Sequence, residues 1–299
     1  MSVVIIPRKH LRMPQGRVRV SDEWLDTGLG AVILPRYGAR NLVTGIAGVG
    51  GQSQRAGQYG VAARCTVASD AADVGISAVG TRAFTWLTVS KFDSPGGTSW
   101  GGFAAAKRGT QYLWALMRQA NGQPALYYRL WTGSGHGSET NYVLPAFGSG
   151  GIEYISGAQA GLIGFAFDAS AGTGTNATVV RQYRDGVEQT NTTTISQSGT
   201  FDMSAEGSFF RAGGNHDGPY GAPQYAPWPH DLWMTLYWPT VALPSELAQD
   251  LQRAPYQVLA ADPIRIYSFP SGPISLTINS ITASNITSSG ARITLGVTR

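Results

Sequence analysis

Residues 231–262 constrain the fold most, because they join a clear strand pattern to the clearest helical pattern in the chain. From 232 to 237 the side chains alternate, so Leu232, Met234 and Leu236 are expected on one face of a strand. Leu243, Leu247 and Leu251 then recur every four residues, which is the spacing of one helix face. The segment therefore predicts a strand followed by one short helix lying against a sheet.

The ends of this predicted helix are marked by prolines. Pro244 suits the first helical position, where its missing N–H is no loss, and Glu246 suits the first turn, where the helix dipole favours negative charge. Pro255 ends the helix. Elsewhere no helical pattern extends beyond about ten residues, so helices are a minor part of the predicted fold.

Most of the remaining chain shows short strand patterns separated by turn residues. Predicted strands cover 83–92, 112–118, 125–131 and 163–167, and Asn121-Gly122 favours a tight hairpin turn between the second and third. The chain has 39 Gly and 16 Pro but only 13% charged residues, a balance that favours many turns over long helices. These features predict an all-β sandwich.

Several motifs follow one another in an order that resembles a known family. They are an apolar strand ending in Asp168, the turn Tyr183-Arg184-Asp185-Gly186, the segment from Phe210 to Gly214, and the helix start Leu243-Pro244-Ser245-Glu246. Over about residues 80–270 the chain resembles LamG-like domains, especially those of bacteriophage virion proteins. The resemblance implies a concanavalin A/LamG-like β-sandwich (jelly roll) with one short helix near the C-terminal end of the domain.

The predicted organisation has three parts: an extended N-terminal arm over 1–21, the sandwich over 22–270, and a linker with a C-terminal β tail over 271–299. Pro14-Gln15-Gly16 in the arm resembles the leader of phage virion proteins. The tail resembles the first strands of a fibronectin type III or Ig-like domain. So short a tail cannot bury a core of its own. It is expected either to pack on its own sandwich or to pair with a sheet edge of a neighbouring subunit.

Both ends of the chain are expected to contact other subunits. An apolar tip and a basic stretch begin the arm, and apolar residues alternate in the tail. A basic arm suits either nucleic acid or an acidic neighbour, and without a recognition motif nucleic acid is the less favoured partner. The expected assembly contacts are Val3, Ile5, Arg8, Lys9, Arg12, Ile274, Leu276, Ile278 and Ile293. Other virion proteins and further copies of this chain are the predicted partners.

Targeting signals are not evident in the sequence. The apolar run at residues 3–6 is too short for a signal peptide, and no stretch reaches the roughly 18 apolar residues of a membrane span. Cys65 is the single cysteine and is expected to be a buried thiol. The predicted location is therefore a virion assembled in the host cytoplasm, with no membrane contact.

The sequence also lacks strong signals of catalysis. Gly97-Thr98-Ser99-Trp100-Gly101 matches the nucleophile-elbow pattern, but glycines and a proline surround it where a strand and a helix are required. The four histidines have no metal-ligand spacing, and the paired carboxylates of a sandwich glucanase strand are absent. The chain is therefore predicted not to be an enzyme.

Two polar loops are candidate glycan sites, because aromatic faces beside amide and carboxylate groups suit sugar rings. The alternative is that these aromatic side chains pack the loops onto the sheet or fill a subunit contact. The candidate residues are Tyr220, Tyr225, Trp228, His136, Glu139 and Asn215. The family resemblance adds a Ca²⁺ ion held by Asp217 or Asp93, and no other cofactor is expected.

The predicted function is that of a non-enzymatic structural protein of a bacteriophage virion, a head decoration or a tail or fibre component, attached through its terminal arms. A carbohydrate-binding adhesin that contacts the host surface is the alternative. A sandwich glycoside hydrolase is the third and least favoured interpretation.

Overall fold

The computed structural model describes residues 18–50, 53–57, 60–66, 70–76, 83–92, 101–108, 111–118, 124–128, 140–143, 161–168, 174–175, 180–184, 187–189, 194–195, 208–213 and 230–261. By its contacts the chain divides into a unit of residues 1–262 and a unit of residues 263–299, and every described residue belongs to the first.

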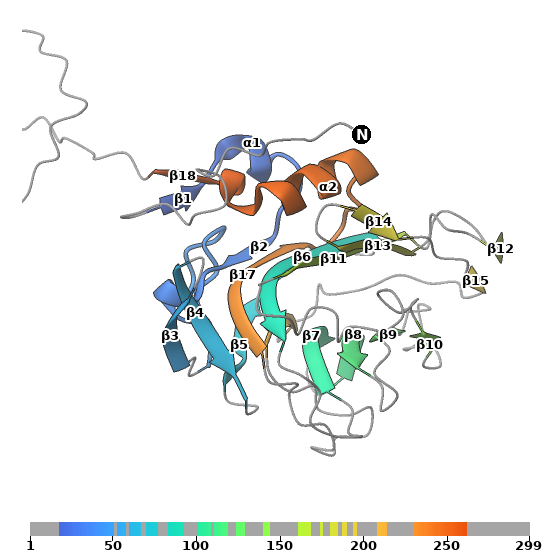
Figure 1. Cartoon of the computed structure of the whole chain (residues 1–299), viewed down its shortest axis with the longest axis horizontal. Helices are drawn as coiled ribbons and strands as arrows, with labels where there is room; N and C mark the ends of the chain where they lie inside the picture. The colour runs from blue at the N-terminus through green and yellow to red at the C-terminus, as the bar shows by residue number, and fades with distance from the viewer. Residues whose placement is uncertain are drawn as a thin grey trace, which may run out of the picture. The chain divides into compact units, whose positions relative to one another are not determined.

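Two antiparallel sheets form the body of this unit, with the helix α2 on the outer side of the larger one (Figure 1). The larger sheet has the order β14 (Val187–Gln189), β13 (Val180–Arg184), β11 (Gly161–Asp168), β6 (Ala83–Phe92), β17 (His230–Trp238), β4 (Gly60–Cys65) and β3 (Ser53–Gly57), with β2 (Ala31–Ile33) also paired to β17. The smaller has the order β10 (Thr140–Val143), β9 (Pro124–Tyr128), β8 (Gln111–Arg118), β7 (Gly101–Arg108), β16 (Ser208–Ala212) and β5 (Ala72–Gly75).

Short elements complete the fold. Two strand pairs stand apart from the main sheets: β1 (Val18–Val20) with β18 (Leu259–Ala261), and β12 (Gly174–Thr175) with β15 (Thr194–Ile195). The helices are α1 (Asp22–Leu25) and α2 (Ser245–Arg253), with the 3₁₀ turns η2 (Pro35–Tyr37) and η6 (Pro255–Val258). The prediction of an all-β sandwich with one short helix near the C-terminal end of the domain is confirmed, and α1 is one helical turn more than the sequence predicted.

Aromatic side chains fill the space between the two sheets. Phe84 stacks on Phe167 with ring centroids 5.5 Å apart, and Trp86 stacks on Phe165 at 5.9 Å. Tyr237 of β17 stacks on Phe210 of β16 at 4.5 Å, which joins the sheets directly. Such rings bury large apolar areas and dominate the energetics of a core. The predicted strand over 163–167 is confirmed as part of β11, and its Ile163, Phe165 and Phe167 are buried.

The strand β17 lies at the centre of the larger sheet, and all nine of its residues are buried. Its register against β6 shifts between Leu232 and Met234, which marks a β-bulge. Trp233, Met234 and Leu236 therefore belong to the cluster on the helix side, whereas Leu232 lies near Gly213 at the end of β16. The predicted shared face of Leu232, Met234 and Leu236 is wrong, because the bulge inserts one residue into the period of two.

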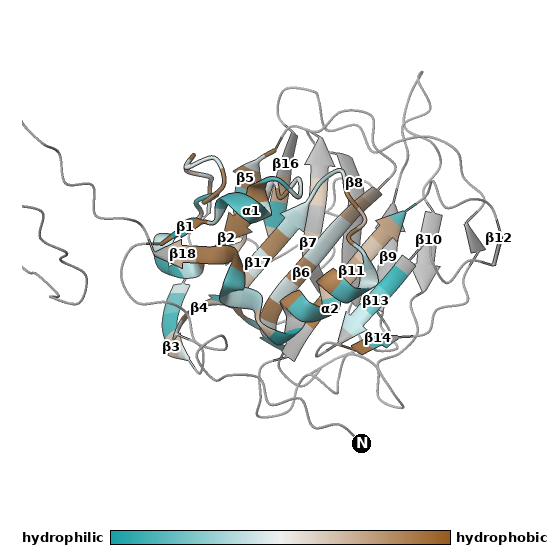
Figure 2. Ribbon diagram, turned by 90° about the horizontal axis from the view of Figure 1, so that it is seen from above, coloured by the Kyte–Doolittle hydropathy of each residue, from teal (hydrophilic) through white to brown (hydrophobic). Residues whose placement is uncertain are grey.

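The predicted short helix is present as α2, and it begins one residue later than expected. Pro244 has extended backbone angles (φ −53°, ψ 146°), so it precedes the helix rather than opening it. Leu243, Ala248 and Leu251 are buried against the larger sheet, and Leu247 is only partly buried. Seen from above, α2 lies over the half of the sheet that contains β11 and β13 (Figure 2). The helix covers the sheet as predicted, with Ala248 as an added contact.

The N-terminal arm and the tail fall mostly outside the described residues. Val18–Val20, which the sequence assigned to the arm, form β1 and pair with β18 in a regular antiparallel register. Ser21 also donates its backbone N–H to the carbonyl of Val258 at 2.9 Å. The last residues of the predicted arm therefore belong to the folded unit, while residues 1–17 are not among those described.

Candidate functional site

All the residues predicted to bind a glycan, a metal or a neighbouring subunit lie outside the described residues. These are Asn215, Tyr220, Tyr225, Trp228, His136 and Glu139 for the glycan, Asp217 and Asp93 for the metal, and the nine assembly contacts between Val3 and Arg12 and between Ile274 and Ile293. The structure instead defines the two residues that border segment 214–229, Gly213 and His230. These two residues and their neighbours on β4 and β17 form the base of this segment.

Gly213 and His230 meet around the buried Cys65. Cys65 on β4 and His230 on β17 are direct register partners, and both are almost fully buried. Gly213 has a φ of +71°, and a Cβ placed there would lie 2.6 Å from Cys65 Sγ and 3.5 Å from His230 Nε2. Only glycine fits this position without strain. Both ends of segment 214–229 are thus anchored in the interior, and the predicted buried state of Cys65 is confirmed.

Asp231 follows His230 and, because side chains alternate along a strand, faces the other side of the sheet. Its side chain is only 4% exposed and pairs with two arginines. Arg55 on β3 donates through Nη2 to Oδ2, and Arg64 on β4 donates through Nη1 to Oδ1 at 3.4 Å. Lys91 occupies the register position opposite Asp231 on β6. The two arginines compensate the buried carboxylate, so Asp231 links the three strands β17, β3 and β4.

A second ion pair connects the smaller sheet to its edge strand. Arg211 on β16 donates through Nε and Nη2 to the two carboxylate oxygens of Asp73 on β5, each at 2.6 Å. This two-bond geometry is the strongest form of an arginine–carboxylate contact. The backbone of Asp73 also exchanges hydrogen bonds with Val49, at 2.8 and 2.9 Å. These contacts fix β5 to the sandwich.

Sequence reasoning missed the residues of this base. Arg55 and Arg64 are 176 and 167 residues away from Asp231 in the chain, so no local motif connects them. Cys65 and His230 were noted separately, and only the strand register places them side by side. The sequence did contain one signal. Asp231 is a charged residue in a mostly apolar strand, and a charge that is buried requires a partner.

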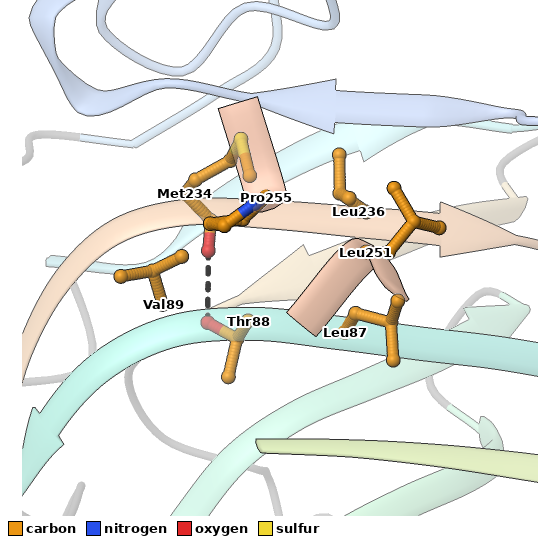
Figure 3. Close-up of a pocket in the computed structure, with 7 residues that line it drawn as sticks. All are labelled: Leu87, Thr88, Val89, Met234, Leu236, Leu251 and Pro255. Carbon is orange, nitrogen blue, oxygen red and sulfur yellow. Dashed lines mark hydrogen bonds between the residues drawn. The ribbon is translucent and has the colours of Figure 1, made fainter. Parts of the chain in front are cut away.

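A small cavity is present in the described interior. A cavity of about 10 Å³ lies between α2 and the larger sheet, lined by Leu87, Thr88, Val89, Met234, Leu236, Leu251 and Pro255 (Figure 3). Its one polar side chain, Thr88, donates its hydroxyl to the Met234 carbonyl at 2.9 Å. An apolar space of this size is a packing gap.

In the described part of the chain, no three His, Cys, Asp or Glu side chains come together as metal ligands would. None of the helices described is long and apolar enough to cross a membrane.

Comparison with known proteins gives a distant likeness in structure. No protein-family model and no curated protein matches this sequence. A SAP-like pentraxin from Limulus polyphemus is 14% identical over 58% of this chain and 71% of its own, with a TM-score of 0.38. The CBM40 of a Ruminococcus gnavus IT-sialidase is 10% identical over 60% of this chain and 97% of its own, with a TM-score of 0.37.

A Trypanosoma rangeli sialidase gives a TM-score of 0.44 at 14% identity, over 78% of this chain and 34% of the sialidase. All three likenesses have identities under 25% and TM-scores under 0.5. They therefore carry no argument about what this chain binds or whether it catalyses a reaction.

Proposed function

We propose that this chain is a non-enzymatic β-sandwich that acts by attachment, as a structural component of a bacteriophage particle. The best support comes from the ion pairs formed by carboxylates that are little exposed to solvent. Arg55 and Arg64 hold Asp231, and Arg211 holds Asp73, so that these pairs tie strands together; the aromatic core between the sheets is buried. The described residues form a packed frame, and in the proposal the attachment contacts are made by segments beyond it.

The link to a phage particle comes from the order of sequence motifs that resembles LamG-like virion proteins. The proposed location is the virion, with assembly in the host cytoplasm through contacts with other virion proteins and other copies of this chain. The arm and the tail provide these contacts in the proposal, since the arm has an apolar tip and a basic stretch, apolar residues alternate in the tail, and neither contains an acidic residue.

Removing the two ends tests the proposal. Because β1 begins at Val18, the N-terminal deletion should stop at residue 17, and the C-terminal deletion should remove 274–299. The full chain is expected to form a defined oligomer in sedimentation velocity, and the doubly shortened chain to sediment as a monomer with an unchanged thermal unfolding midpoint. Equal self-association of the two chains, with both folded, contradicts the proposal.

Carbohydrate binding is the second candidate function, and the anchoring of segment 214–229 favours it. This segment contains Tyr220, Tyr225 and Trp228, and both of its borders are fixed by buried residues, Gly213 and His230. A binding loop on a rigid base loses less conformational entropy when it takes up a ligand.

A glycan array with the purified chain tests this candidate. Replacing Tyr220 and Trp228 together by Ala is expected to abolish any binding, and repeating the array with EDTA tests for Ca²⁺ at Asp217 or Asp93. Binding that the double replacement leaves intact rules out this loop as the site. Release of shorter sugars from a bound glycan supports the hydrolase alternative instead.

A further inference from the structure

The outermost strand of the larger sheet, β3, is an open edge in the described part of the chain. β3 has one neighbour in the sheet order, β4, with which it pairs from Ser53–Arg64 to Gly57–Gly60 (Figure 1). All five of its residues are exposed. A strand in this position presents a row of backbone N–H and C=O groups to a further strand.

β3 lacks the features that usually protect a sheet edge, which are proline, bulges and outward charges. Its register with β4 is regular along all five pairs, and its sequence Ser-Gln-Arg-Ala-Gly contains no proline. Its one charged side chain, Arg55, is drawn back onto the sheet by Asp231.

The other described edges of the two sheets are less available. The edge strands β14 and β2 have three residues each. The edge strand β5 is covered at Asp73 by the backbone of Val49, and β10 has four residues. Among these edges β3 is the longest, so it offers the most hydrogen bonds to an added strand.

The register identifies which backbone groups point outward. Gly57 and Gly60 pair with two residues between them, and a two-residue connection closes on a pair that exchanges both hydrogen bonds. Arg55 and Gly57 therefore bond inward to β4. The N–H and C=O groups of Gln54 and Ala56 face the open side.

We infer that this edge receives the C-terminal segment 274–278 of a second copy of the chain. That segment has five residues, as β3 has, and its Ile274, Leu276 and Ile278 alternate as in a strand. Twelve residues, 262–273, connect it to the end of β18 and span up to about 40 Å when extended, which is enough to reach a neighbour. The inference rests on the proposed function, because it names the surface that the tail attaches to. Recognition is by β-strand addition.

The edge is tested in the full chain by Ala56→Pro, which removes an outward N–H and leaves the inward bonds to β4 in place. Ala56→Val keeps the N–H and is the matched control. In sedimentation velocity the Ala56→Pro chain is expected to run as a 31.7 kDa monomer, and the control to assemble as the unchanged chain does. Leu276→Pro in the tail is expected to give the same monomer.

Mixing the two proline variants makes the test independent of either variant alone. The Ala56→Pro chain keeps its tail and the Leu276→Pro chain keeps its edge, so one junction remains possible between them. A one-to-one complex is expected from the mixture, while each variant alone stays monomeric with an unchanged circular dichroism spectrum.

Three outcomes overturn the inference, and they are distinguishable from failure of the proposed function. Assembly that survives Ala56→Pro shows that β3 is not the acceptor. Assembly that survives Leu276→Pro but is lost on deleting residues 1–17 assigns the contact to the N-terminal arm. Monomers in the mixture, with assembly of the unchanged chain, show that the tail does not pair with β3 of another copy. If deleting both ends leaves assembly intact, it is the proposed function that fails.

Discussion

Gly213 is the residue at which the backbone conformation is most demanding. Its φ of +71° belongs to the left-handed region, and the space around its Cα is filled by Cys65 and His230. Sequence alone marks it only as the first of two glycines after a strand. The chain at Gly213 passes so close to Cys65 on β4 and His230 on β17 that glycine is necessary there.

Gly213→Ala is expected to lower the free energy of unfolding by roughly 1–3 kcal/mol, because the new methyl group meets Cys65 Sγ in a strained backbone conformation. Urea unfolding followed by circular dichroism measures the change. Gly75→Ala in β5 is the control, since no atom lies within 4 Å of a Cβ there. Equal stabilities of the two variants contradict the anchoring role of Gly213.

Tyr183 on β13 has a buried phenol whose protonation depends on the fold. Burial raises the pKa of Tyr183 to about 12, while the nearby Arg181 acts in the opposite direction. The Ser245 hydroxyl is close enough to favour the ionised form slightly, but no hydrogen bond of normal geometry joins it to the phenol. The folded chain therefore retains a proton that the unfolded chain, with a pKa near 10, releases.

This difference predicts the effect of Tyr183→Phe at high pH. A raised pKa in the folded state gives stability that is complete below pH 10 and is lost as the pH rises toward 12. The variant should match the unchanged chain within about 1 kcal/mol at pH 7. Its stability should fall less steeply between pH 10 and 12, as measured by chemical unfolding at each pH. Identical pH profiles would show that Tyr183 does not titrate differently on unfolding.

Among the elements, β17 shows what a periodic pattern predicts and where it fails. The alternation from 232 to 237 correctly indicated a strand, and the structure extends it to His230–Trp238 and buries all nine residues. Because of the bulge at Trp233, Leu232 points to one face of the sheet, whereas Met234 and Leu236 point to the other. Trp233 lies under the β3–β4 hairpin, where it donates its indole N–H to the Gly60 carbonyl at 3.3 Å. The bulged residue contacts a hairpin that is distant in the sequence, so the local pattern does not reveal the bulge.

The helix α2 contributes to stability mainly through its buried leucines. Leu251→Ala is expected to cost about 2–4 kcal/mol, because Leu251 is 1% exposed and truncation enlarges a cavity that it already lines. Leu247→Ala, at a partly buried position on the same helix, is the matched comparison and should cost less. Thermal unfolding of both variants measures the difference. A larger loss from Leu247→Ala would place the packed face of α2 elsewhere.

At the scale of the whole molecule, two kinds of long-range contact define the frame formed by the described residues. Aromatic stacking joins the two sheets, and the pairs of Asp231 with Arg55 and Arg64 connect β17 to the β3–β4 hairpin. This second contact also holds the β3 edge in place. The proposed attachment of a neighbouring tail therefore uses a strand that the interior of the sandwich fixes.

The sequence by itself determined the fold class, the hairpin between β8 and β9, the position of α2 within one residue, and the buried state of Cys65. These follow from side-chain periodicity, turn residues and prolines, which act over a few positions of the chain. The bulge in β17, the pairing of Cys65 with His230, the partners of Asp231 and the open edge of β3 were decided by the tertiary structure. Each depends on residues far apart in the chain, and strand order and register, which bring them together, are not encoded in any local pattern.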